Sequence, residues 1–421
     1  MEETILTTVP PYFIHFGCWN NGGCPKDNNL TRVLHNINSL QPRPAFLSIC
    51  GDNYYPTTIK TKETKIIDGV KIEKEKKKKF LDLDDLKSGF DCLPPDLPIY
   101  MTYGNHDFET NLILKPLIDG KEHIETDCQL IKQEISIIEQ TSNIHLNLYN
   151  ERIFNTYTKL LFLDTTIYDD DDATDPNVIK CYSNIILDGH PMVADVNEIR
   201  EKQLAYIRAF VESIETDTNI TNVVIIGHHP LIQFKYKNDM KLINLSQLLN
   251  RILYYEIYDK MKSRNITYYY LCADLHQFQP GNIVLHDNMN IKQYIVGTGG
   301  ATKDPLHKEL LLSTITTPLA SIDPHISYNM TATDIEQASD DAGYLKCISH
   351  NTTIEFVFIK VPLSSSSSGG NNKTRQTKRI QTKRRQTKRR QTKRRQTKRR
   401  QTKRRQTKRR QTKRRQTKLK N

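Results

Sequence analysis

Residues 45–55 read Ala-Phe-Leu-Ser-Ile-Cys-Gly-Asp-Asn-Tyr-Tyr. The first six residues are mainly apolar, and this short run predicts a buried β-strand. The run stops at Gly51, and Asp52 and two tyrosines follow it directly. The stretch therefore predicts a loop that presents polar side chains at the carboxyl end of a strand.

The same arrangement of an apolar run followed by a polar motif occurs four more times. The motifs are Gly17-Cys18-Trp19-Asn20 after residues 12–16, Gly104-Asn105-His106-Asp107 after 99–103, Gly227-His228-His229-Pro230 after 223–226, and Ala273-Asp274-Leu275-His276 after 268–272. Loops at the carboxyl ends of strands can converge on one crevice. Asp, Asn, His and Tyr supply oxygen and nitrogen donors that suit iron, zinc or manganese. One such motif alone is a common turn, but five in order indicate a metal site.

The remaining patterns predict an α/β domain. Residues 159–163 form a sixth apolar run, and residues 196–214 and 245–261 show the periodicity of amphipathic helices. Residues 283–286 and 292–296 are expected to pair as a hairpin, and residues 344–349 and 353–361 as a closing strand pair. Because no Gly/Pro/Ser-rich linker interrupts this part, we expect a single domain over residues 10–364.

Two segments stand apart by their charge. Residues 60–91 form a charged insertion whose Asp68-Gly69 could close a hairpin, although such charge runs favour a solvated surface loop. Residues 365–375 are a Ser/Gly/Asn-rich linker, and residues 376–421 repeat Gln-Thr-Lys-Arg-Arg, seven times in perfect register from Gln381 to Arg415. This tail has almost no apolar residues, so we expect it to be disordered.

The formal charge of +13 hides an uneven distribution, because 27 of the 61 Lys and Arg residues lie from Lys373 onward, where no acidic residue occurs. The rest of the chain has 34 basic and 48 acidic residues, a formal charge of about −14. The eight cysteines include no Cys-x-x-Cys pair, so they indicate neither a zinc knuckle nor a disulfide framework, and we expect them to be mostly reduced. With no apolar leader and no run long enough to span a membrane, an intracellular location, cytoplasmic or nuclear, is expected.

The order and wording of the five motifs resemble the metallophosphoesterase (calcineurin-like) superfamily, and within it the purple acid phosphatases of the small tartrate-resistant type. The family pattern runs Asp-Trp-Gly, Gly-Asp-x-x-Tyr, Gly-Asn-His-Asp or Glu, Gly-His-x-Pro and Gly-His-x-His. The similarity covers nearly all of the first 364 residues. It implies two mixed β-sheets packed face to face between helices.

The resemblance also implies two metal ions, divalent or trivalent, with Fe paired with Zn, Mn or Fe. Asp52 would bridge both ions, Tyr55 and His276 would bind the first, and Asn105 and His228 the second. His106 would face the phosphate as a hydrogen-bond donor or general acid, and Asp107 would orient it from behind. Two ligands differ from the family: Cys18 replaces an Asp at the first ion, and Asp274 replaces a His at the second.

These implications predict a metal-dependent phosphoric monoester hydrolase that uses a metal-activated hydroxide. A softer thiolate at the first site leaves a rival, namely a catalytically weakened fold that serves as a binding or structural module. His15 could compensate for Cys18 but is more typical of a packed strand residue, and His229 is expected to pack or to line the rim. The tail is a candidate for binding nucleic acid without sequence preference; slippage of a repeat in a disordered terminus is the plain alternative.

Overall fold

A computed structural model describes residues 11–362, apart from 25–26, 68–69, 110, 118–119, 127, 170–171, 188, 238, 244–246, 285–289 and 309–326. The chain divides into two units, Met1–Leu363 and Ser364–Asn421, and the described residues all belong to the first. The repeat tail and its linker lie outside the described residues. Their predicted disorder stays a prediction.

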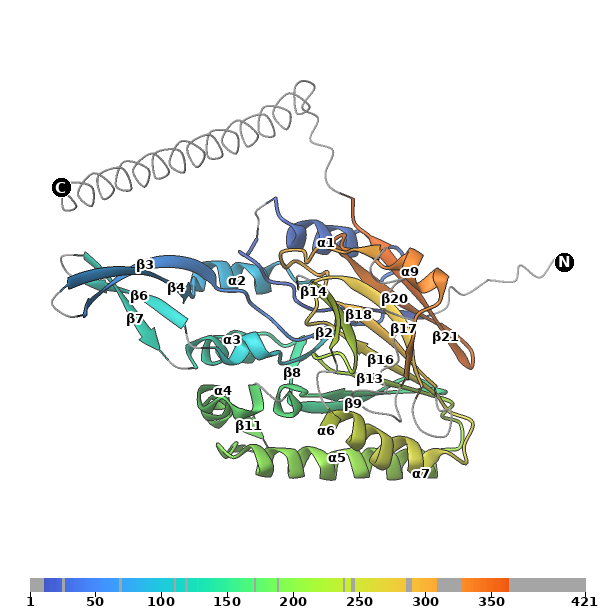
Figure 1. Cartoon of the computed structure of the whole chain (residues 1–421). Coiled ribbons are helices and arrows are strands. Elements are labelled where there is room, and N and C mark those ends of the chain that lie inside the picture. The colour runs from blue at the N-terminus through green and yellow to red at the C-terminus, as the bar shows by residue number, and fades with distance from the viewer. Residues whose placement is uncertain are drawn as a thin grey trace, which may run out of the picture. The chain divides into compact units, whose positions relative to one another are not determined.

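Two large mixed sheets form the centre of the first unit (Figure 1). The six-stranded sheet has the order β21 (Thr353–Lys360), β20 (Gly343–His350), β1 (Tyr12–Phe16), β2 (Leu47–Cys50), β5 (Ile99–Thr102) and β8 (Ile144–Leu146). The seven-stranded sheet has the order β19 (Ser327–Asn329), β17 (Phe278–Val284), β18 (Asn290–Val296), β16 (Thr267–Cys272), β13 (Asn222–Ile226), β10 (Thr158–Leu163) and β9 (Tyr149–Asn155). Strands β1, β2, β5 and β8 run parallel, and so do β10, β13, β16 and β18.

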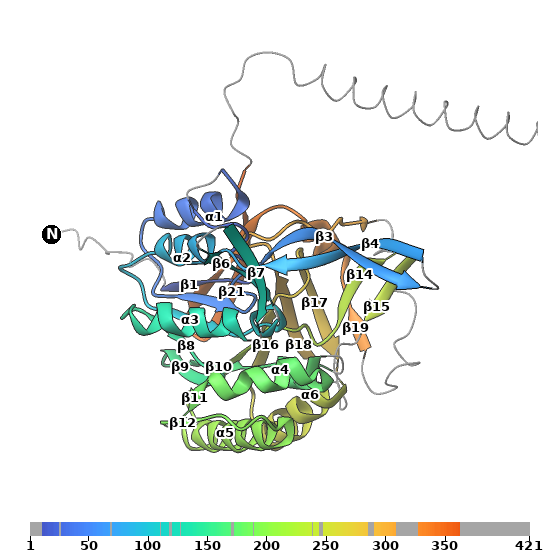
Figure 2. The same cartoon turned by 90° about the vertical axis from the view of Figure 1, so that its left-hand side faces the viewer.

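Helices cover the outer faces of both sheets (Figures 1 and 2). Helices α1 (Asn29–Asn38), α2 (Leu83–Asp91) and α3 (Gln129–Glu139) lie on the side of the six-stranded sheet. On the other side lie α4 (Pro176–Cys181), α5 (Val196–Thr216) and the run α6 (Gln247–Ile252), η5 (Leu253–Tyr258) and α7 (Asp259–Met261). The predicted helix over 245–261 thus contains a π-helical stretch, η5. The short helix α9 (Ala332–Gln337) precedes β20.

The central strands are mainly apolar because both of their faces are buried. Val223 and Ile225 of β13 pack in the cluster that contains α5, whereas Val224 and Ile226 pack in the cluster that contains β1, β2 and α1. Continuous apolar runs are typical of strands buried between two layers. The α/β class, with two mixed sheets packed face to face between helices, is confirmed, as are the six predicted strands and the closing strand pair. Strands β17 and β18 do pair as a hairpin, but residues 292–296 pair with 278–282 and not with the predicted 283–286, of which 285–286 lie outside the described residues.

The charged insertion is a hairpin followed by a helix, where its charge had favoured a surface loop. Strand β3 (Thr57–Ile67) pairs antiparallel with β4 (Val70–Phe80), and α2 begins at Leu83. Strands β6 (Asn111–Leu117) and β7 (Gly120–Thr126) complete a four-stranded sheet with this hairpin, and the sequence had not indicated them. The smaller pairs are β11 (Ile186–Leu187) with β12 (His190–Pro191), and β14 (Gln233–Lys237) with β15 (Asp239–Ile243).

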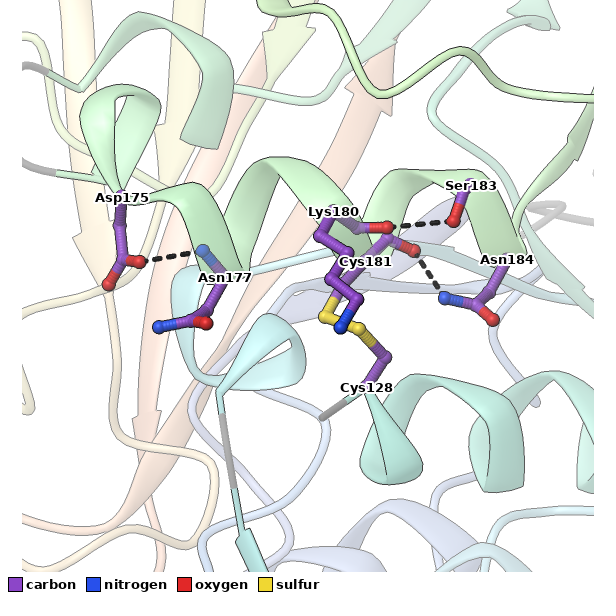
Figure 3. The surroundings of a disulfide bond; sticks show 7 residues. All are labelled: Cys128, Asp175, Asn177, Lys180, Cys181, Ser183 and Asn184. Carbon is purple, nitrogen blue, oxygen red and sulfur yellow. Dashed lines mark hydrogen bonds between the residues drawn. A yellow bond between two sulfur atoms is a disulfide. The ribbon is translucent and has the colours of Figure 1, made fainter. Parts of the chain in front are cut away.

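One disulfide joins Cys128, at the N-terminal cap of α3, to Cys181, the last residue of α4 (Figure 3). The other six cysteines are free. The expectation that most cysteines are reduced is met by those six, but it missed a bond between residues 53 positions apart. Disulfides persist mainly in oxidising compartments. The intracellular location stays a prediction. Within the described residues, no helix combines the length and the apolar character needed to cross a bilayer.

Candidate metal centre

The five motifs follow strands of both sheets. Cys18, Asp52 and Asn105 come after β1, β2 and β5 of the six-stranded sheet, and His228 and Asp274 come after β13 and β16 of the seven-stranded sheet. Strands β1, β2 and β5 are parallel to one another, and so are β13 and β16. The carboxyl ends of each set therefore lie at one edge of their sheet. The structure therefore gathers motifs that are far apart in the sequence.

The backbone turns sharply at three of these strand ends. Cys18, Asp52 and Asp274 have positive φ angles of 52°, 52° and 57°, a conformation that non-glycine residues seldom adopt. Gly51, before Asp52, has a φ of 79°, and a Cβ atom there would lie 2.7 Å from Nδ1 of His228. Strained conformations of this kind cluster at functional sites, where the surrounding structure enforces them.

Asp52 lies at the centre of the cluster, and its two carboxylate oxygens face different partners. Oδ2 accepts a hydrogen bond from the hydroxyl of Tyr55 at 2.5 Å and lies 3.7 Å from Sγ of Cys18. Oδ1 accepts from the backbone N–H of His106 at 3.2 Å and lies 3.2 Å from Nε2 of His228. Asp52 is 1% exposed, so it meets these partners away from water.

The two histidines of the cluster are held in the same way. Nδ1 of His228 lies 2.8 Å from the carbonyl oxygen of Cys50, and Nδ1 of His276 lies 2.7 Å from that of Thr302. In each ring the carbonyl fixes Nδ1 as the protonated nitrogen, which leaves Nε2 available toward the cluster. Nε2 of His276 lies 3.0 Å from the Tyr55 hydroxyl.

The donor set fits metal ions. One ligand atom each from Cys18, Asp52 and His228 lie within 4.8 Å of one another. Nε2 of His228 and Oδ1 of Asn105 are buried and make no hydrogen bond. Unsatisfied buried polar atoms are rare and need an explanation. A bound cation would supply one, because carboxylate, phenol and imidazole groups are its usual ligands.

The charges of the cluster are strongly coupled. Burial alone would raise the pKa of Asp52, but His228 and His106 outweigh it and hold that pKa well below its usual range. In turn, although burial acts in the opposite direction, Asp52 raises the pKa of His228 to about 10 and that of His106 to about 9. Burial and the Asp52 charge raise the pKa values of Cys18 and Tyr55. A cation would take over the balancing role of the two imidazolium groups.

Asp107 makes contacts other than the expected ones. Its oxygens accept from the backbone N–H groups of Asn53 at 2.8 Å and Gly104 at 2.7 Å, and from the side chain of Asn53. It thereby ties the loops after β2 and β5 together, whereas Nδ1 of His106 faces Glu109 at 2.7 Å. His106 occupies the 3₁₀ turn η1 (Asn105–Phe108), and Glu109, three residues on, is the carboxylate that its Nδ1 faces.

The sequence did not indicate three residues that lie near the site. Glu109 lies just outside its motif, and Lys79, which contacts Glu109 and lies 3.5 Å from Nδ1 of His106, belongs to a charge run read as solvated. Glu134 of α3 is fully buried beside Asp107, and burial raises its pKa well above the usual value. A spacing of three residues from His106 could have indicated Glu109, but no local signal indicated the other two.

The other predicted residues also have defined places. Asp274 accepts from Nε2 of Gln233 at 3.1 Å, and its charge contributes to the raised pKa values of Cys18 and His228. His15 is completely buried between Ser48 and Cys50, as expected of a packed strand residue. His229 is 3% exposed, with Nδ1 3.0 Å from Oγ1 of Thr165.

No protein-family model and no curated protein sequence matches the chain. Among solved structures, GAP50, described as the anchor in the inner membrane complex of Plasmodium, is similar at 12% identity over 86% of this chain and 87% of that one, with a TM-score of 0.43. PhoD is similar at 12% identity over 87% of this chain and 73% of that one, with a TM-score of 0.46.

Proposed function

We propose that this cluster binds two metal ions and hydrolyses phosphomonoesters. The proposal rests on one observation: the two carboxylate oxygens of Asp52 face two different groups of side chains, with Tyr55 at Oδ2 and His228 at Oδ1. On the Oδ2 side, Tyr55, His276 and Cys18 would hold one ion. On the Oδ1 side, Asn105, His228 and Asp274 would hold the other. The donor types suit iron with zinc, manganese or a second iron.

Metal ions in such a site supply Lewis-acid chemistry, which lowers the pKa of water and offsets the charge of a phosphate group. The residues of the chain position the reaction around them. The His106 side chain is 29% exposed, so a substrate can reach it, whereas Asp52 and His228 are buried. Glu109 holds Nδ1 of His106, which leaves Nε2 to donate a proton to the departing alkoxide. Lys79 adds a positive charge beside the same imidazole.

The presence of a cysteine at position 18 supports a second candidate function, that of a binding or structural module without catalysis. Its thiol stands where the resemblance implies a carboxylate, and burial together with Asp52 raises its pKa. A thiolate is a softer ligand than a carboxylate and suits iron less well, so an ion on the Oδ2 side would be bound more weakly. The two candidates differ in metal content and in turnover.

The experiment combines metal analysis with hydrolysis of an aryl phosphate by the full-length protein. Asp52→Asn is expected to lower the rate by at least about 100-fold and to reduce metal content, because one carboxylate serves both sides. Asp164→Asn is the matched control: Asp164 is also fully buried, but it accepts from Tyr182 and Thr166, and its substitution should preserve both properties. Two bound ions without hydrolysis would support the binding module. Equal rates for Asp52→Asn and the unchanged protein would refute the proposed site.

A further inference from the structure

Part of the loop that follows β1 packs closely against helix α2. Nδ2 of Asn20 donates to the carbonyl of Leu86 at 3.1 Å, and the amide of Cys24 donates to Oγ of Ser88 at 3.1 Å. Gly23 has a φ of 65°, and a Cβ atom there would lie 2.2 Å from Oγ of Ser88. The loop needs glycine to come this near, and the contact fixes Cys24 against the helix.

Two free thiols meet beside this contact. Cys92 caps the C-terminus of α2, four residues after Ser88, so both side chains leave the same face of the helix. Sγ of Cys24 lies 3.5 Å from Oγ1 of Thr31, and Cys92 is a close neighbour of Cys24: burial together with Cys24 raises the pKa of Cys92 to about 12. Cys92 is partly exposed to solvent, whereas Cys24 is buried.

We propose that Cys24 and Cys92 are a dithiol pair that closes to a second disulfide in the presence of a small disulfide oxidant. The thiolate of one cysteine attacks glutathione disulfide and releases one glutathione thiolate. The other cysteine then attacks the protein sulfur of the mixed disulfide and releases the second. Two protein thiols are oxidised, one glutathione disulfide is reduced to two thiols, and the protons pass to the released thiolates.

Exposure separates this pair from the remaining free cysteines. Cys18, Cys50, Cys272 and Cys347 are all 0% exposed, so an oxidant in solution cannot reach them in the folded protein. The new bond would fasten the loop that carries Cys18 to α2. The inference rests on the packing of this loop and is independent of the proposed phosphatase activity.

The test incubates the folded full-length protein with glutathione disulfide, followed by acid quenching, alkylation in denaturant, proteolysis and mass spectrometry. A Cys24–Cys92 linked peptide is expected to contain most of the recovered Cys24 and Cys92. The Cys128–Cys181 linked peptide serves as the internal positive control. Because the pKa of Cys92 is high, the linkage should form about tenfold faster for each pH unit between neutral and alkaline solution if Cys92 is the attacking thiolate.

Two variants make the result specific. Cys92→Ser should abolish the linked peptide, whereas Cys347→Ser, at another free cysteine, should leave it unchanged. Circular dichroism and melting of the oxidised protein should show an intact fold with a higher Tm, because the bond restricts the unfolded chain. Recovery of both cysteines as free thiols or as separate glutathione adducts would overturn the proposal. Linkage only in molecules that have lost their native spectrum would overturn it as well.

Discussion

Cys18 is the residue whose identity most affects the proposed site. Its φ of 52° is tolerated better by aspartate than by most side chains, so Cys18→Asp should fit the existing backbone. The new carboxylate would lie near Oδ2 of Asp52, which is 3.7 Å from the Cys18 sulfur. We predict an increase in metal affinity of about tenfold, the scale on which changes in a metal's surroundings act, with a parallel gain in aryl phosphate hydrolysis.

Metal titration of Cys18→Asp, Cys347→Ser and the unchanged protein checks this prediction. Cys347 lies on β20 and is fully buried, so its substitution controls for the loss of a buried thiol. If neither affinity nor rate rises in Cys18→Asp, the thiol is already a competent ligand or the weakness lies elsewhere.

The buried imidazole of His15 should make the stability of the fold depend on pH in acid. Burial lowers its pKa from 6.5 to about 3, so the folded protein keeps this imidazole neutral. Below pH 6.5 the unfolded chain binds a proton that the folded chain does not, so stability falls as the pH falls from 6.5 toward 3. Between pH 6.5 and 4 this one group should lower the free energy of unfolding by roughly 3 kcal/mol.

Urea unfolding across that pH range, compared with His15→Gln, isolates the effect. The variant has no titrating ring and should lose stability less steeply in acid. His35→Gln, at an exposed histidine of α1, should keep the slope of the unchanged protein. Parallel slopes for His15→Gln and the unchanged protein would show that His15 is protonated in the fold.

At the scale of elements, α3 holds an acid against the loop after β5. Glu134 is fully buried beside Asp107, and its pKa is raised well above 4.5, mainly by burial. As the pH rises above 4.5, the unfolded chain releases this proton while the folded chain retains it, so the group destabilises the fold progressively. Glu134→Gln keeps the shape of the side chain and removes its titrating carboxyl group. The stability of this variant relative to the unchanged protein should therefore increase with pH.

Unfolding free energies at pH 5 and pH 8 measure this trend. Glu139→Gln, at the exposed end of the same helix, should show no such trend. A variant Glu134→Gln that loses more stability at pH 8 than at pH 5 would mean that Glu134 is ionised and bound by a positive partner.

At the scale of the whole molecule, the acidic body and the basic tail predict separable activities. The tail, residues 376–421, carries 25 positive charges without aromatic partners, so it should bind nucleic acid through phosphates and without sequence preference. If about ten phosphates are engaged, log affinity for duplex DNA should fall with log salt with a slope of about −9. A variant that ends at Ser364 should lose this binding and keep aryl phosphate hydrolysis. Equal affinity with and without the tail would contradict the prediction.

The sequence by itself determined the strands and the order of the site motifs. Each central strand is buried on both faces, so its apolar run, such as residues 223–226, is legible without any knowledge of its neighbours. Each run ends in a polar turn that marks the carboxyl end of the strand. These are local signals, and local signals can be read from a linear sequence.

Only the tertiary structure decided which side chains meet. Glu109 rather than Asp107 faces His106 because the 3₁₀ turn directs Asp107 back to the amides of Asn53 and Gly104. The Cys128–Cys181 bond joins residues of two packed helices, and the Cys24–Cys92 contact joins a loop to a helix. The spacing of these cysteines in the sequence indicates neither pairing. Contacts between distant segments depend on how whole elements pack, because each partner's own neighbours do not encode the other's position.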